Sequence, residues 1–594
     1  MQTRKIVLLV AAIAALFAGA SRQLLAATLY WDGTGTVWGP PPTWGPSAWS
    51  TSSSATTPNP AATPGASDVA TFNISTLNTS QTVDLWTNYS VLGLVFDNTA
   101  STLIRPFGPG ANSLTIGTSG INVNAAAGPV TLSPNVLYVS ASQTWTNNSA
   151  NKVTVNSYVD LSNGSLGGLG RILTLDGSGD FSIAGSINAS SKLIKNGAGT
   201  LTLNGANDNV GLTLVANAGT VILDKPSVAT PGLFTEIHAI GAGLTVAGAS
   251  VKLAGTGGDQ IYQSAIVDIQ SGAFDTNGRS EGFRELKLAG NGFGATGAIL
   301  NSAAGTTSQL TINGPVTFTG DTTLGGAGDL NIFTNGGFTG AGSFNITKVG
   351  SGFVSVPSGP YKSVHVKAGT LSIGGNTFAA ASGTVTVDAG AGFKTGSMTT
   401  ARTFIVDGKL EVHLGQTLQL TNGFLTNNGV QTGALAVNNG SIVKGSGSFD
   451  VVTVRDGGTF APGNSPGAAT VKTLSFQSVA TTGGPTLAIE LGGTAPGTDY
   501  DQLHVTGALN ANGTLNVSLV GGFSPSIGDT FDILDFGTLT GTFSSLQLPT
   551  LATGMWNTSQ LYTNGILAVV PEPHTTSLCL LALFFAAQFR RGST

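Results

Sequence analysis

Residues 193–203 read Leu-Ile-Lys-Asn-Gly-Ala-Gly-Thr-Leu-Thr-Leu, and residues 218–223 read Ala-Gly-Thr-Val-Ile-Leu. In both segments a glycine and a threonine precede apolar residues at alternate positions. Glycine suits a tight turn, and an alternation with a period of two puts every second side chain on one face of a β-strand. The stretch therefore predicts a strand that follows a turn and buries one face.

The same pattern of glycine, threonine and alternating apolar residues recurs along the chain. It occurs at 199–203, 219–223, 369–373, 383–387 and 513–517. One such strand cannot bury its apolar face alone, so stacked neighbours must complete a common core. Repeats of about 20–30 residues with one or two strands each favour a parallel β-helix over a sandwich. A propeller is the main alternative, but its blades require a stricter period than this sequence has.

The composition excludes several classes of protein. Of 594 residues, 85 are glycine and only 9% are charged, against about 25% in a typical soluble domain. The hydrophobic residues, 41% of the chain, alternate regularly, which predicts an ordered protein. The net charge is -5 without a basic cluster, so no nucleic-acid partner is expected. A single cysteine, Cys579, excludes an internal disulfide framework and a cysteine-based metal site.

Residues 1–27 have the build of a secretory signal peptide. Arg4 and Lys5 precede the apolar run Ile6–Ala18, and small residues follow at Ala18–Ala20 and again at Ala26–Ala27. We expect a signal helix here that signal peptidase removes after export, rather than a buried N-terminal helix.

Residues 28–66 are rich in tryptophan, proline and glycine. Four tryptophans stand in this segment, at Trp31, Trp38, Trp44 and Trp49. We expect them to cap the open end of a β-solenoid, with an exposed carbohydrate-stacking strip as the alternative. The solenoid itself is expected over 67–482, and 483–570 is expected to be a further β region that continues it or caps it.

Several blocks resemble autotransporter-associated β-strand repeats. They are residues 193–207, Ala218-Gly219-Thr220, Ala461-Pro462-Gly463-Asn464-Ser465-Pro466-Gly467 and Tyr500-Asp501-Gln502-Leu503-His504-Val505-Thr506-Gly507. The resemblance implies an all-β chain folded as a right-handed parallel β-helix (β-solenoid), similar to an autotransporter passenger.

The C-terminal segment 571–594 resembles a PEP-CTERM sorting signal. It contains Pro571, Glu572 and Pro573, then the apolar run Ser577–Phe589, and finally Arg590 and Arg591. The resemblance implies an exosortase-type sorting enzyme as partner, acting near the Pro-Glu-Pro tripeptide. The run predicts a short transmembrane helix, although it falls below the roughly 20 residues that span a bilayer comfortably. The two arginines would hold its end on the cytoplasmic side. A permanent anchor is the alternative to this transient one.

A search for catalytic motifs gives only formal matches. Residues 463–467 fit a Gly-x-Ser-x-Gly nucleophile elbow, but Pro466 has no backbone N–H for an oxyanion. Residues 292–297 fit a dinucleotide fingerprint, but a strand and turn are expected after them where the fingerprint needs a helix. We expect no cofactor.

Acidic and histidine residues form only isolated pairs. Glu236 with His238 and Glu411 with His413 are two residues apart, which suits solvent-facing pairs better than a zinc site. The closest carboxylate pairs are Asp176 with Asp180, Asp499 with Asp501, and Glu281 with Glu285, and each stands beside turn residues. We expect no metal site and no catalytic residues.

The sequence thus favours an exported structural or adhesive protein of the bacterial cell surface or extracellular matrix. Exopolysaccharide or neighbouring surface proteins are the expected partners. The alternative is a polysaccharide-cleaving enzyme on a β-helix scaffold, because that fold also carries such enzymes.

Overall fold

The computed structural model describes residues 26–33, 35–39, 48–54, 63–73, 79–108, 110, 112–162, 170–188, 192–227, 237–340, 342, 344–359, 361–374, 378, 383–478 and 483–572. Within these ranges the chain is nearly all β, and η1 (Phe293–Ala295) is a short 3₁₀ turn between strands. The predicted signal helix and most of the sorting segment lie outside the described residues. No helix in the described part is both long and apolar enough to span a membrane.

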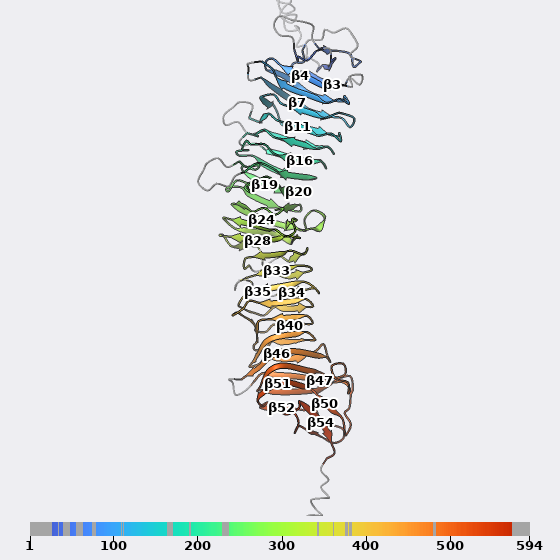
Figure 1. The fold of residues 1–594 in the computed structure, drawn as a ribbon, viewed down its shortest axis with the longest axis vertical. Helices are drawn as coiled ribbons and strands as arrows, with labels where there is room; N and C mark the ends of the chain where they lie inside the picture. The colour runs from blue at the N-terminus through green and yellow to red at the C-terminus, as the bar shows by residue number, and fades with distance from the viewer. Residues whose placement is uncertain are drawn as a thin grey trace, which may run out of the picture. The chain divides into compact units, whose positions relative to one another are not determined.

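The chain divides into two compact units, residues 1–316 and 317–594. Each unit is built from short strands that pair in parallel with the strand one coil later. Figure 1 shows the strands of each unit stacked as successive rungs. This parallel stacking is the arrangement of a β-solenoid and excludes a propeller, whose blades are separate four-stranded sheets.

The first unit contains two long parallel ladders that run through its middle. One ladder consists of β13 (Ile172–Asp176), β15 (Lys192–Lys195), β17 (Thr213–Ala216), β19 (Gly243–Val246), β21 (Ile266–Ile269) and β24 (Glu285–Gly290). The other consists of β11 (Val153–Val155), β14 (Phe181–Ile183), β16 (Thr200–Leu203), β18 (Thr220–Leu223), β20 (Ser250–Leu253), β22 (Ala273–Asp275) and β25 (Ile299–Asn301). The remaining strands of this unit are β1 (Thr28–Trp31), β2 (Trp49–Ser50), β3 (Val69–Phe72), β4 (Gln81–Leu85), β5 (Tyr89–Phe96), β6 (Thr102–Pro106), β7 (Ser113–Val123), β8 (Val130–Leu132), β9 (Val136–Val139), β10 (Gln143–Asn147), β12 (Tyr158–Asp160), β23 (Glu281–Phe283) and β26 (Thr307–Ile312).

The core of this unit is a set of apolar columns. Leu201 lies opposite Val221, which lies opposite Val251, and all three are fully buried. Each buried aliphatic side chain contributes about 1.5–3 kcal/mol relative to an exposed one. Because alternate residues point outward, the register that stacks these columns also stacks the polar side chains between them.

The glycines of the repeated pattern are required by the packing of one coil on the next. At Gly199, Gly219, Gly369, Gly383 and Gly513 an added Cβ would lie closer than 3.0 Å to a backbone oxygen of the preceding coil. Gly219 and Gly369 also have positive φ angles of 71° and 64°. The repeat therefore keeps glycine because no side chain fits between adjacent turns.

Two buried lysines bind turn carbonyls in a similar way in the two units. Lys195 ends β15, and its Nζ donates to the carbonyls of Gly197 and, one coil later, Ala218. In the second unit Lys348 donates to Gly350 at 2.7 Å and to Ala368 at 3.2 Å, again one coil later. Both side chains are at most 1% exposed, and burial lowers the pKa of each lysine. Each lysine thus links its own turn by hydrogen bonds to the Ala-Gly-Thr segment of the next coil.

Three of the four N-terminal tryptophans are buried together. The ring centroids of Trp31 and Trp38 lie 5.2 and 5.0 Å from that of Trp49, which packs on Phe72. These three residues therefore do not form an exposed stacking strip. Trp44 lies outside the described residues.

The second unit also stacks in parallel. One ladder consists of β30 (Ile346–Lys348), β32 (Val364–Val366), β34 (Thr384–Val387), β37 (Thr403–Val406), β40 (Phe424–Asn427), β43 (Ile442–Gly445), β45 (Thr459–Pro462), β47 (Thr486–Leu491), β49 (Thr514–Leu519) and β52 (Ser545–Gln547). A second ladder consists of β28 (Asp329–Thr334), β31 (Phe353–Val356), β33 (Thr370–Ile373), β35 (Gly392–Thr395), β38 (Lys409–Val412) and β41 (Val430–Thr432). The other strands are β27 (Val316–Gly326), β29 (Phe338–Thr339), β36 (Met398–Thr400), β39 (Thr417–Leu420), β42 (Ala434–Val437), β44 (Ser448–Arg455), β46 (Ala468–Gln477), β48 (Gln502–Ala511), β51 (Leu534–Gly541) and the three described next.

A small antiparallel sheet follows the last parallel strands. It consists of β50 (Thr530–Asp532), β54 (Ile566–Val570) and β53 (Met555–Asn557). Phe531 is fully buried in it, with its ring 5.4 Å from that of Tyr500 and 6.0 Å from that of Trp556.

Candidate functional site

The residues of the predicted sorting signal are only partly described. Pro571 and Glu572 directly follow β54, and both are exposed. Pro573, Arg590 and Arg591 lie outside the described residues.

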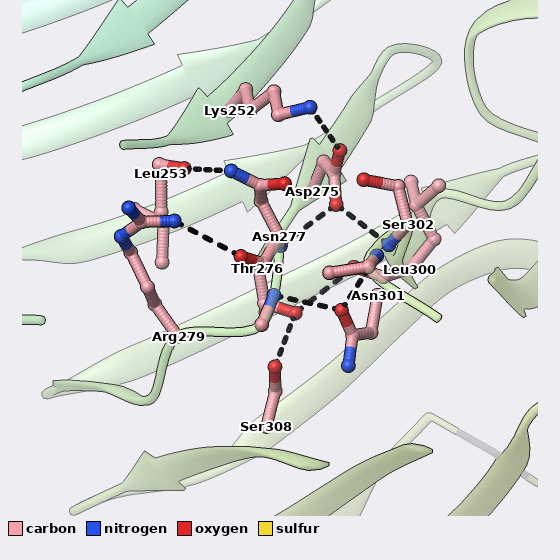
Figure 2. A network of polar contacts seen from close by, with 12 residues as sticks. Lys252, Leu253, Asp275, Thr276, Asn277, Arg279, Leu300, Asn301, Ser302 and Ser308 are labelled. Atoms are coloured by element: carbon pink, nitrogen blue, oxygen red, sulfur yellow. Dashed lines mark hydrogen bonds and ion pairs between the residues drawn. The ribbon is translucent and has the colours of Figure 1, made fainter. Parts of the chain in front are cut away.

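Several acidic side chains near the turns accept hydrogen bonds from backbone N–H groups. Figure 2 shows one such network, in which the Asp275 carboxylate accepts hydrogen bonds from the backbone N–H groups of Asn277 and Ser302 at 2.9 and 3.0 Å. The same carboxylate lies 3.7 Å from Nζ of Lys252. Asn277 in turn donates to the carbonyl of Leu253 at 2.9 Å. These contacts join three successive coils, so the carboxylate has a structural role.

The predicted carboxylate pairs behave in the same way. Asp180 accepts from the N–H of Thr200 at 2.7 Å, and Asp176 accepts from Gly177 at 2.8 Å. Glu281 is buried in β23, whereas Glu285 in β24 is partly exposed and lies 4.0 Å from Lys287. Of these four residues, Glu281 alone lines one of the two grooves described below.

The two formal motifs are turns. Ser465 of the elbow-like stretch donates its hydroxyl to Glu490 at 2.5 Å. The 292–297 stretch contains η1 and leads into β25, a strand, as expected.

The prediction that both Glu–His pairs face solvent holds for one pair and fails for the histidine of the other. Glu411 and His413 share the outward face of the second unit, as their spacing predicts. Glu236 lies outside the described residues, and the prediction that its partner His238 faces solvent is wrong. The His238 side chain is 3% exposed, and its ring nitrogens lie 3.4 Å from Asp208 and 3.6 Å from Asp259. These two carboxylates raise the pKa of His238 to about 9 against the opposing effect of burial.

A polar groove in the first unit, the Asp259 groove, begins beside this histidine. Its volume is about 410 Å³, and it is lined by Gly257, Gly258, Asp259, Gln263, Ser280, Glu281, Gly282, Gln309, Thr311 and Asn313. Burial raises the pKa of Glu281, although its oxygens accept N–H groups of Gln260 and Gly282 at 2.8 and 2.9 Å. Two carboxyl groups, those of Asp259 and Glu281, thus face one groove.

A second groove, the Phe333 groove, lies on the outer face of the second unit. Its volume is about 660 Å³, and its lining includes Phe333, Phe353, Ser355, Pro357, Ser372, Gly374, Lys394 and His413. The register of β31, β33, β35 and β38 aligns Ser355, Ser372, Lys394 and Glu411 in one outward column. Ser355 and Ser372 thus form a floor of small side chains. Phe353 lies two residues before Ser355, and Phe333 lies two residues after Asn331, which is opposite Ser355, so the phenylalanines flank this floor.

Lys394, which lines the Phe333 groove, belongs to an ion-pair network. The Glu411 carboxylate lies 2.6 Å from Nζ of Lys394 and 2.9 Å from Nζ of Lys409. These two lysines lower the pKa of Glu411 to about 2. The network therefore keeps fixed donors and acceptors at the surface over the whole neutral range.

Hydroxyl groups form columns on the outer faces of both units. In the first unit Thr131, Thr154, Ser182 and Thr202 lie opposite one another on successive strands, although Ser182 is itself buried. In the second unit the same holds for Thr459, Thr486, Thr514 and Ser545. Adjacent members are about 4.8 Å apart, the spacing of paired strands. Among the described residues, no group of three or more His, Cys, Asp or Glu side chains is placed to hold a metal ion.

Sequence reasoning missed both grooves because their residues come from different coils. Asp259 and Glu281 are 22 positions apart, and Ser355 meets Ser372 only through the pairing of β31 with β33. A constant coil length would have identified such neighbours, but the coil length varies, from 20 residues between Thr200 and Thr220 to 30 between Thr220 and Ser250.

No family model matches this chain, and neither the curated proteins nor the solved structures include a significant match.

Proposed function

We propose that this chain is an exported structural or adhesive protein of the bacterial cell surface or extracellular matrix, folded as a right-handed β-solenoid. The observation that carries the proposal is the pair of hydroxyl columns on stacked outer faces. Such columns offer many equivalent, uncharged hydrogen-bonding groups at a regular spacing, which suits repeated weak contacts with polysaccharide or with neighbouring surface proteins.

The route to the surface in this proposal uses both ends of the chain. Signal peptidase would remove residues 1–27, and an exosortase-type enzyme would act near Pro571-Glu572-Pro573. The exposure of Pro571 and Glu572 directly after β54 supports access by such an enzyme. The segment with Arg590 and Arg591 would serve as the transient membrane anchor.

Surface location and envelope integrity test this function. Immunogold labelling of intact cells should place the protein outside the cell, and deletion of its gene should alter the envelope or cell–cell adhesion in thin sections and settling assays. A protein found only in the cytoplasm would contradict the proposal.

A polysaccharide-cleaving enzyme is the second candidate, because Asp259 and Glu281 line one groove and burial raises the pKa of Glu281. A protonated acid beside a second carboxyl group is the arrangement of many glycosidases. Against it, backbone N–H groups occupy both Glu281 oxygens, as in a turn cap. Release of reducing ends from an exopolysaccharide panel, lost in Glu281→Gln, would favour the enzyme.

A further inference from the structure

We propose that the Phe333 groove binds a neutral glycan chain that lies along the stacked rungs of the second unit. The inference rests on the adhesive function proposed above and assigns it a particular site and ligand class. Five rungs border the groove, from β28 to β38, and four spacings of about 4.8 Å give it a length of about 19 Å. That length suits an extended chain of several sugar units rather than a small metabolite.

The floor of the groove cannot hold a peptide by adding a β-strand. Strand β31 is paired with β28 and β33, and β35 is paired with β33 and β38. Their backbone N–H and C=O groups are therefore already used in the ladder, whereas β-strand addition requires a free edge. A ligand here must be recognised by side chains.

The walls and floor offer the two kinds of contact that a sugar ring needs. Phe333 is 49% exposed, although it is a large apolar side chain, and Phe353 stands at the opposite side of the floor. Aromatic rings pack against the C–H faces of sugars, and hydroxyl and amide groups bind sugar hydroxyls. Ser355 and Ser372 supply hydroxyls between the two phenylalanines.

The depth of the groove depends on Gly374. A Cβ added there would meet no atom within 4 Å, and the φ of Gly374 does not lie in the left-handed region. The glycine is therefore not required by the backbone, unlike the glycines of the repeated turns. It leaves open the space between Phe333 and the serine floor that a ligand would fill.

The lysines at the Glu411 end of the groove are already paired, which disfavours a polyanion. Glu411 lies within ion-pair distance of both Lys394 and Lys409, at 2.6 and 2.9 Å. With the lysines paired to a carboxylate, a polyanion would have to break the network to bind. A neutral glycan can use the same groups as hydrogen-bond donors and acceptors without displacing them.

Calorimetry with the purified full-length chain tests the site. The probes are hexasaccharides of β-1,4-glucan, β-1,3-glucan, α-1,4-glucan and β-1,4-mannan, with hexagalacturonate as the polyanion. We expect at least one neutral hexasaccharide to bind. Gly374→Trp should abolish that binding by filling the groove, and Phe333→Ala should weaken it by about tenfold, the loss of one stacking contact.

The matched control is Phe424→Ala, which removes an equally exposed phenylalanine, 45% exposed, from β40 of the same unit. It should bind like the parent chain, and thermal melting should show that every variant is folded. The absence of binding to all four neutral probes, binding of hexagalacturonate alone, or equal affinity in Phe333→Ala would each overturn the inference. A chain that is located at the surface but binds no neutral glycan refutes the groove alone, whereas a cytoplasmic location refutes the proposed function itself.

Discussion

The carboxylate of Asp501 accepts a 2.7 Å hydrogen bond from the backbone N–H of Gly467, 34 residues earlier in the chain. Its other oxygen accepts the N–H of Glu490 at 2.9 Å. Asp501 is 1% exposed, and burial raises its pKa to about 7. Two sequence motifs, Ala461–Gly467 and Tyr500–Gly507, are thus joined by one buried side chain.

Replacement of Asp501 should destabilise the second unit. Asp501→Ala leaves two buried N–H groups without an acceptor, which costs about 1–3 kcal/mol. Hydrogen exchange of the Gly467 and Glu490 amides at pH 4, where the contribution of Asp501 is nearly complete, should become faster. Asp499→Ala is the control, because Asp499 is exposed and accepts only a weaker 3.2 Å bond from Ala495. Equal effects of the two substitutions would contradict the conclusion that the buried hydrogen bonds of Asp501 stabilise the second unit.

The raised pKa of Asp501 makes the stability of the chain depend on pH. The folded pKa of about 7 lies above the unfolded value of 3.8, so the contribution of Asp501 to stability is complete below pH 3.8 and is lost as the pH rises through 7. The parent chain should therefore lose stability relative to Asp501→Ala between pH 4 and 8. Parallel pH profiles of the two melting temperatures would show that Asp501 does not titrate in this range.

Removal of an internal lysine should loosen one coil-to-coil contact. Lys348→Met deletes the hydrogen bonds to Val349, Gly350 and Ala368 and leaves buried carbonyls without a donor, at a cost of about 2 kcal/mol. Exchange of amides in β30 and β33 measures the loss. Lys367→Met, at an exposed position one coil later, should change little.

Two glycines of the second unit should respond oppositely to alanine. Gly369 has a φ of 64° and no space for a Cβ, so Gly369→Ala should lower the stability by about 2–4 kcal/mol. Gly374→Ala should be neutral or slightly stabilising, because its Cβ meets open space and alanine restricts the unfolded chain. Urea titration of both variants gives the comparison, and a destabilised Gly374→Ala would show that the groove is not open.

His238 should make the first unit less stable at alkaline pH. Its pKa of about 9 in the folded chain exceeds the unfolded value of 6.5, so its contribution is complete below pH 6.5 and is lost as the pH rises through 9. The difference between these two pKa values sets an upper bound of about 3 kcal/mol on the contribution of His238 to the free energy of unfolding. His238→Gln should flatten the pH profile of thermal unfolding between pH 6 and 9.5, and an unchanged slope would exclude His238 as its source.

Sorting cleavage is read directly from the mass of the mature protein. If an exosortase-type enzyme acts near Pro571-Glu572-Pro573, intact-mass analysis of the surface form should show a chain that lacks the segment with Arg590 and Arg591. Glu572→Ala should accumulate the uncleaved form. A mature surface protein that still ends at Thr594 would indicate a permanent anchor.

The sequence predicts the strands much better than it predicts the surfaces they form. Each recurrence of the glycine–threonine pattern coincides with a strand, for example Thr200–Leu203, Thr370–Ile373 and Thr384–Val387. The alternation is local and is enforced by burial of every second residue, so it is visible without the register.

The surfaces depend on the register, which varies with coil length. Thr200 pairs with Thr220, 20 residues later, but Thr220 pairs with Ser250, 30 residues later. Because loops of unequal length separate the strands, the sequence does not specify that Asp259 meets Glu281 or that Phe353 and Phe333 flank the same floor. The burial of His238 escaped prediction for the same reason, since both of its carboxylate neighbours come from other coils.

The lysine contacts between coils limit the lengths of duplicated segment that the fold can accept. Lys348 binds Ala368 20 residues ahead, and Lys195 binds Ala218 23 residues ahead, so donor and acceptor always belong to successive coils. A tandem duplication that copies one whole coil therefore adds one lysine and one alanine carbonyl together. The original lysine can bind the carbonyl of the copied coil, and the copied lysine can bind the carbonyl of the coil after it. A duplication of part of a coil would separate them and would also turn the apolar face outward. Related genes should accordingly differ in length by whole coils, with lysines such as Lys195 and Lys348 still one coil before the alanine carbonyl that they bind.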